Sequence, residues 1–294
     1  MNSTIILAQF PPEYMDTYLA VEAIISMLSI VGCVFNVIVT LVLRSWKYTG
    51  RMVIGLSIMD FLACFSMVVQ PIPIESEFLC RILSFTRCFG FGGSFAWICC
   101  FAHSLMIILK ADGEVNVIDA YLNRYALIAL ISGLFNGVLA FVSQYKAIDE
   151  SGYCTHAASK SGVMINLLID TIPSWVTIFY CIFVYVYVAK KLKQLSSQSH
   201  SELLFYPLIL IICTIPKSTR ELYILFTGET VEVGLYIAAS AFFLSQGLWN
   251  GLAYGLTRSI LEGCKKDPSS VRSSFQEGEM VTDMSLNSMS TNRF

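Results

Sequence analysis

Charged residues are scarce in this sequence. Only 14% of its 294 residues are Asp, Glu, Lys or Arg, whereas 55% are hydrophobic. So little charge cannot cover the surface of a water-soluble globule of this length, which excludes that class and indicates a membrane protein. The formal net charge is −2, from 19 basic and 21 acidic residues. No overall electrostatic field therefore favours nucleic acid as a partner.

Two further absences exclude particular classes of membrane protein. The sequence has only three histidines, His103, His156 and His200, and the predicted topology keeps them too far apart to meet at one metal, as a metal-dependent membrane hydrolase would require. A retinal-binding light sensor or pump needs a lysine in its seventh helix for a Schiff base, and no Lys or Arg occurs between 231 and 257. We therefore expect no enzyme activity, no metal and no cofactor.

Seven apolar runs are long enough to cross a membrane. A helix needs about 20 predominantly apolar residues to span roughly 30 Å of hydrocarbon. No fixed-period repeat relates the runs to one another. The sequence predicts an all-α bundle of seven transmembrane helices at 18–43, 52–70, 82–109, 123–143, 163–188, 203–226 and 231–257.

The basic residues of the connections set the orientation. Thirteen Lys and Arg residues, including those of the tail, fall on one side of the predicted bundle, and two, Lys146 and Lys160, fall on the other. Basic residues are retained on the cytoplasmic side during insertion. We therefore predict an extracellular N-terminus (1–17), a transmembrane domain (18–257) and a cytoplasmic tail (258–294) that is disordered after a short juxtamembrane helix.

Four residues are candidates for covalent modification. Cys80 and Cys154 both face the outer, oxidising side, where a disulfide would tie a loop over the bundle, with two free thiols as the alternative. Asn2 begins an Asn-Ser-Thr glycosylation pattern. Cys264 follows the last span on the cytoplasmic side and is a candidate for palmitoylation.

Ionisable residues recur in the outer third of the predicted spans. Each costs roughly 2.5–3.5 kcal/mol near the bilayer centre, so each needs a partner or a water-filled cavity. We predict that a small extracellular ligand, with a phosphate or carboxylate as a candidate group, is bound here by Arg87, Asp170, Lys217, Arg220 and Glu221. The alternative is that these residues pair with one another, as the spacing of Lys217 and Glu221 allows. Glu22 and Arg81 lie nearer the boundary, where reaching to the lipid headgroups explains them equally well.

A second polar layer lies nearer the cytoplasm. Asn36, Asp60 and Asn250 belong to the first, second and seventh predicted helices, and we predict a repackable network among them, with plain helix-to-helix hydrogen bonding as the alternative. Pro207 and Pro216 predict kinks in the sixth helix. If that helix swings outward, a groove opens on the cytoplasmic side for a helix of an intracellular partner.

Several strings of residues resemble G protein-coupled receptors, and the cyclic AMP receptor-like group in particular. They are LSIMD at 56–60, YPLILIICTIP at 206–216 and QGLWNGLAYG at 246–255, together with the seven helices and the Cys80 and Cys154 positions. Within the last string, Asn250 and Tyr254 are similar to the Asn-Pro-x-x-Tyr element of rhodopsin-like receptors, with glycine in place of proline.

The third predicted helix departs from the rhodopsin-like class, because it ends without an acidic-Arg-aromatic triplet. This absence favours the cyclic AMP receptor-like group. The resemblance implies a plasma-membrane protein in which a ligand drives activation of a heterotrimeric G protein, and a switch network of Asn36, Asp60, Asn250, Tyr254 and Pro216. It does not identify the ligand.

The tail from 258 to 294 is rich in Ser and Thr and poor in apolar residues. Phosphorylation there would create a negatively charged strip for an arrestin-like, desensitising partner, with unregulated disorder as the alternative. A small-solute transporter with a site near the bilayer midplane remains the rival function, because outer polar groups and kinked helices also suit alternating access.

Overall fold

The structure is a computed structural model of the 294-residue chain. It describes residues 12–42, 48–70, 72, 76–111, 116–142, 167–195, 205–227 and 231–255. The chain divides into two compact units, Met1–Gly255 and Leu256–Phe294, and every described residue belongs to the first. All regular secondary structure within the described ranges is helical.

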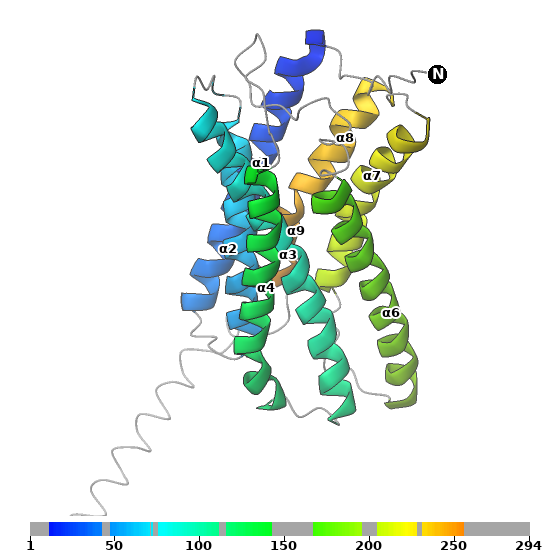
Figure 1. Ribbon diagram of the computed structural model, residues 1–294. Helices are drawn as coiled ribbons and strands as arrows, with labels where there is room; N and C mark the ends of the chain where they lie inside the picture. Colours follow the sequence, from blue (N-terminus) through cyan, green and yellow to red (C-terminus); the bar gives the residue numbers. More distant parts are fainter. Residues whose placement is uncertain are drawn as a thin grey trace, which may run out of the picture. The chain divides into compact units, whose positions relative to one another are not determined.

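Figure 1 labels the longer helices of the chain. Their bounds are η1 Pro12–Tyr14, α1 Met15–Val42, α2 Tyr48–Val69, α3 Glu77–Lys110, α4 Asn116–Val142, η2 Leu167–Thr171, α6 Ile172–Leu195, α7 Phe205–Thr227, α8 Val233–Leu244 and α9 Gln246–Gly255. Each predicted span coincides with one helix or a pair of consecutive helices. The ends differ from prediction by several residues, because hydropathy marks the part of a helix in hydrocarbon and not the turns beyond it.

Five helical segments are long and apolar enough to cross a membrane: Met15–Val42, Gly50–Val69, Glu77–Lys110, Ile118–Val142 and Leu167–Lys191. The chain is therefore a multi-pass membrane protein in its coarse architecture. Helix α7 has 23 residues but carries three charged side chains in its second half. Helices α8 and α9 have 12 and 10 residues, each too short to cross alone. Seven spans and the orientation of the termini remain predictions.

The polarity of α1 is reversed relative to a helix on the surface of a soluble protein. Apart from Leu19, its buried positions are small or polar, among them Ser29 and Asn36, whereas the side chains of Ile24 and Val31 are 58% and 63% exposed. Large apolar side chains gain nothing from facing water, and small or polar residues are those that pack helices together in lipid. The arrangement fits a surface covered by acyl chains.

Helix α1 packs closely on α9 through glycines. A methyl group at Gly32 would lie 2.6 Å from the Gly247 carbonyl oxygen and 2.7 Å from the Leu248 Cα. Gly251, four residues after Gly247 and therefore on the same face of α9, lies against Gly32 as well. Small residues four apart allow two backbones to approach within van der Waals distance.

The predicted seventh helix, 231–257, is divided at Ser245 into α8 and α9. The Ser245 hydroxyl donates a hydrogen bond to the Phe242 carbonyl at 2.7 Å, a local bond that competes with continuous helix. The break leaves the Leu248 N–H without an intrahelical partner, and the Ser29 hydroxyl of α1 accepts it at 3.2 Å. Hydropathy carries no signal for such a break.

The two prolines of α7 differ in effect. Pro207 lies in the first turn, where a missing N–H removes no intrahelical bond, so the kink predicted there does not follow. Pro216 lies inside the helix, one residue before Lys217. It is therefore the proline placed to bend α7 next to the charged residues.

Candidate functional site

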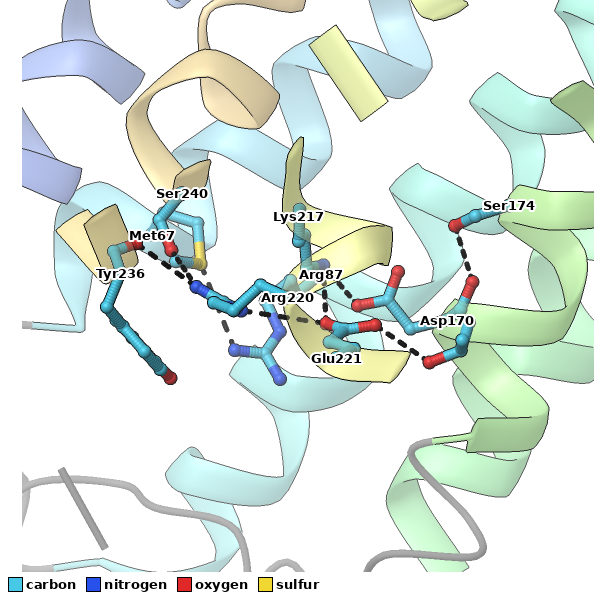
Figure 2. A network of polar contacts seen from close by, with 10 residues as sticks. Met67, Arg87, Asp170, Ser174, Lys217, Arg220, Glu221, Tyr236 and Ser240 are labelled. Carbon is cyan, nitrogen blue, oxygen red and sulfur yellow. Dashed lines mark hydrogen bonds and ion pairs between the residues drawn. The ribbon is translucent and has the colours of Figure 1, made fainter. Parts of the chain in front are cut away.

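Charged side chains from α1, α3, η2 and α7 gather in one place, which we call the ionic cluster. Its members are Glu22, Arg87, Asp170, Lys217, Arg220 and Glu221. Figure 2 shows Glu221 at its centre, with Asp170 on one side and Tyr236 and Ser240 on the other. The sequence could not show that Glu22 belongs to this set.

Lys217 and Glu221 make the ion pairs at the heart of the cluster. Lys217 forms a salt bridge with Asp170, and its Nζ lies 3.8 Å from Glu221 Oε1. The guanidinium of Arg220 lies 3.6 Å from the same carboxylate. The three α7 residues share one face because they are three and four positions apart. Pairing of the predicted ligand residues with one another, the alternative, is thus realised for Asp170, Lys217, Arg220 and Glu221.

The short π-helix η2 places two consecutive residues against α7. Asp170 contacts Lys217, and the hydroxyl of the next residue, Thr171, donates to Glu221 Oε2 at 2.7 Å. A π turn is an uncommon element that often occurs at functional sites. The sequence contains no signal that distinguishes this turn from the helix that follows it.

Arg220 is anchored on α8. Its Nη1 donates to the Ser240 hydroxyl at 2.8 Å and to the Tyr236 carbonyl at 3.2 Å, and its guanidinium carbon lies 3.9 Å from the centre of the Tyr236 ring. The side chain is 7% exposed, and its Nε has no hydrogen-bond partner among the described residues. One donor of this buried cation is therefore left over.

Aromatic rings form the wall behind Lys217. Its Nζ lies 3.9 Å from the centre of the Phe243 ring and 5.8 Å from that of Phe91. The negative faces of such rings attract a desolvated ammonium group. The rings therefore stabilise the Lys217 charge in addition to its two carboxylate partners, Asp170 and Glu221.

Glu22 and Arg87 complete the cluster from α1 and α3. Glu22 is 5% exposed, so its predicted alternative, reaching to the headgroups, is wrong. It contacts Tyr18 and lies near enough to Arg87, Arg220 and Lys217 to interact with their charges. Arg87 lies beside Met67, with 3.9 Å from Nη1 to the sulfur. Its predicted part in ligand binding stays a prediction.

Arg81 lies apart from this set. It pairs with Glu77 one turn earlier on α3, at 2.7 Å, with both side chains partly exposed. The pair is a local one of the kind that two residues four apart form on any exposed helix. It accounts for Arg81 without a ligand.

A second buried polar group, the Asp60 cluster, consists of Asp60, Ser94, Gln246 and Asn250. The Ser94 hydroxyl donates to Asp60 Oδ1 at 2.6 Å, and the Asn250 amide donates to Oδ2 at 3.2 Å. Gln246 donates to Ser94 at 3.3 Å. The predicted link between Asp60 and Asn250 is present, and it includes α3, which the sequence analysis left out.

Asn36 joins this region by a different route. Its amide donates to the Ser57 hydroxyl of α2 at 3.3 Å, so it ties α1 to α2 next to the Asp60 cluster. Its carbonyl oxygen is buried without a partner among the described residues. The side chain of Tyr254 lies outside the described part of the chain, and its predicted switch role stays a prediction, as does that of Pro216.

The predicted modification sites are described only in part. Cys80 is buried and carries no free thiol, whereas Cys154 lies outside the described residues, so their pairing stays a prediction. Asn2 and Cys264 also lie outside them. The described free cysteines are all within helices, as small apolar residues commonly are.

His103 has a local partner. Its Nδ1 lies 2.9 Å from the Tyr125 hydroxyl of α4, and the two rings meet edge to face. Within the described ranges, no three His, Cys, Asp or Glu side chains are placed to hold a metal ion. The contact fits a packed, hydrogen-bonded histidine.

No protein-family model matches this chain, and no curated protein matches its sequence.

Proposed function

We propose that the chain is a plasma-membrane receptor with seven spans, its N-terminus outside and its C-terminus in the cytoplasm. In this proposal it binds a small extracellular ligand at the ionic cluster and activates a heterotrimeric G protein by movement of α7. Helix α7 serves as the sixth span, and α8 with α9 serves as the seventh. An arrestin-like protein at the phosphorylated tail, glycosylation of Asn2, palmitoylation of Cys264 and a Cys80–Cys154 disulfide belong to the same proposal.

One observation carries the proposal: two separate buried polar clusters are held by two consecutive helices, α8 and α9. Tyr236 and Ser240 of α8 hold Arg220, and Gln246 and Asn250 of α9 hold Ser94 and Asp60. Only Ser245 separates the two helices. In this proposal, a ligand that shifts Arg220 moves α8 and, because α9 follows after one residue, disturbs the Asp60 cluster and so couples the two sites.

Nucleotide exchange tests the proposal directly. The full chain is reconstituted with a panel of purified G proteins and exposed to cyclic nucleotides, sugars, amino acids and peptides. We expect at least one compound to accelerate exchange, and the Arg220→Gln variant to lose that response at matched protein level. Glu77→Gln, in an exposed pair outside the cluster, is the matched control and retains it. A complete panel without agonist-dependent exchange contradicts the proposal.

A transporter is the second candidate, because one observation favours it. The break at Ser245 makes the last predicted span discontinuous, and broken helices form the midplane sites of many transporters. Uptake of labelled solute into proteoliposomes separates the two functions. A transporter accumulates solute without any G protein, whereas a receptor does not accumulate it.

A further inference from the structure

The ionic cluster balances its charges within itself. Among the described residues, the carboxylates of Asp170 and Glu221 face the cations of Lys217 and Arg220 in salt bridges, and Glu22 and Arg87 add one nearby charge of each sign. The central groups are buried or nearly so, with side-chain exposures of 7% for Arg220 and 14% for both Lys217 and Glu221. A ligand that enters this region has to exchange partners with existing ion pairs.

The balance decides which ligand charge is tolerated. A plain anion that binds Lys217 or Arg220 displaces a carboxylate and leaves it buried without a counter-ion, which is strongly unfavourable. A plain cation that binds Glu221 or Asp170 strands Lys217 or Arg220 in the same way. A molecule that carries one group of each sign avoids both penalties. Its carboxylate takes the place of a protein carboxylate beside the cation, and its ammonium group pairs with the protein carboxylate that was displaced.

Arg220 provides a second, independent indication. Its Nη atoms are occupied by Ser240, Tyr236 and Glu221, but its Nε is buried without a hydrogen-bond partner among the described residues. An unpaired donor on a buried cation is unfavourable, and an oxygen acceptor at this position would satisfy it. Within the described ranges no protein acceptor reaches this atom, although Glu221 is the next residue in α7 and Thr171 of η2 donates to Glu221.

From these two observations we infer that the ionic cluster binds a small zwitterion, with an anionic oxygen group (carboxylate or phosphate) at Arg220 and an ammonium group at Asp170 and Glu221. This inference rests on the proposed ligand site, and it adds an ammonium group to the phosphate or carboxylate group expected from the sequence. Two sources supply this chemistry: a soluble amino acid-like molecule, and the phosphoethanolamine headgroup of a lipid.

Thermal unfolding of the purified full chain in a nonionic maltoside detergent tests the inference. The probes are ω-amino carboxylates with one to five methylene groups, each compared with the carboxylate and the amine of equal length. We expect at least one ω-amino carboxylate to raise Tm by about 3 °C or more near saturation. Its half-saturating concentration should be at least tenfold below those of its two singly charged analogues.

The lipid source has its own arm. The same chain is placed in nanodiscs of phosphatidylglycerol with and without phosphatidylethanolamine. A rise in Tm that needs phosphatidylethanolamine, and that Arg220→Gln abolishes, assigns the zwitterion to a headgroup. A rise with the soluble probes in detergent assigns it to a soluble molecule. Equal response to singly charged and zwitterionic probes, or no response in either arm, overturns the inference.

Charge-changing variants sharpen the result. Glu221→Gln leaves the cluster with one excess positive charge, so the preference should move to the plain carboxylate. Lys217→Met leaves one excess negative charge and should move it to the plain amine. Glu77→Gln removes an exposed carboxylate outside the cluster and should leave the zwitterion preference unchanged. If a cluster variant fails to fold, the comparison of probes on the unaltered chain still shows whether the cluster prefers a zwitterion.

The outcome is separable from that of the receptor proposal. Zwitterion binding without nucleotide exchange on any G protein contradicts the receptor and leaves the inference standing. Exchange driven by a plain anion that binds as tightly as any zwitterion supports the receptor and contradicts the inference.

Discussion

Lys217 in the middle of α7 forms a salt bridge with Asp170 in η2. The two residues are 47 positions apart in the sequence, and the pair joins the start of the fifth predicted span to the second half of the sixth. Each side chain would be unfavourable alone at this depth. Together they hold η2 against α7.

We predict that this pair behaves as a unit in unfolding experiments. Removing one partner of a buried ion pair costs about 3–5 kcal/mol, because the other charge remains buried. Asp170→Asn and Lys217→Met should each lower the Tm of the detergent-solubilised chain. The double variant should lose less than the two single losses added together. Additive losses would show that the two side chains act independently.

The contact between α1 and α9 predicts an unusual sensitivity to a single methyl group. Gly32→Ala should destabilise the fold by about 1–3 kcal/mol, because the new methyl meets backbone atoms that cannot move aside. Gly234→Ala, where nothing lies within 4 Å of the added methyl, is the matched control and should leave Tm within a degree or raise it. Equal effects at both positions would contradict the close approach.

The Asp60 cluster predicts a change in basal signalling. Asn250→Ala removes one hydrogen bond between α9 and α2, and a bond worth about 1 kcal/mol shifts a two-state equilibrium about fivefold. If the cluster holds the resting arrangement, basal nucleotide exchange should rise severalfold at matched surface expression. Asn123→Ala, at an exposed position of α4, should leave it unchanged. Loss of expression alone would instead favour plain helix-to-helix hydrogen bonding.

Cys80 predicts a specific cross-link. Non-reducing peptide mapping should recover a fragment that joins Cys80 to Cys154. Cys80→Ser and Cys154→Ser should each lower the free energy of unfolding by about 2–4 kcal/mol and lower Tm to the same extent. The double variant should lose no more than either single variant. Cys99→Ser, at a described free thiol in the same helix, controls for loss of sulfur. Separate free thiols at both positions would contradict the disulfide.

Much of the candidate site was accessible from the sequence through depth alone. A rise of about 1.5 Å per residue placed Asp170, Lys217, Arg220 and Glu221 at one level, and the structure brings all four into contact. Depth does not report which way a helix is turned. Glu22 was assigned to the boundary because it lies only one turn into the first predicted span, although it is buried and lies near the charges of the cluster.

The contributions of Ser94, Gln246, Tyr236 and Ser240 were missed for a related reason. Uncharged polar residues are common in membrane helices and bear no signal that separates a hydrogen-bonding partner from a packing residue. Their roles depend on what faces them, as Ser94 faces Asp60 and Ser240 faces Arg220. Only the rotation of each helix determines this.

The sequence by itself determined the class of this protein and the helical segments, because hydropathy and length are local properties that the bilayer selects directly. The tertiary structure alone decided that α8 ends at Leu244, that Gly32 lies against α9, and which carboxylate meets which cation. Those features depend on how closely and at what rotation helices pack. Contacts between residues far apart in the chain set both, and no local pattern in a single sequence records them.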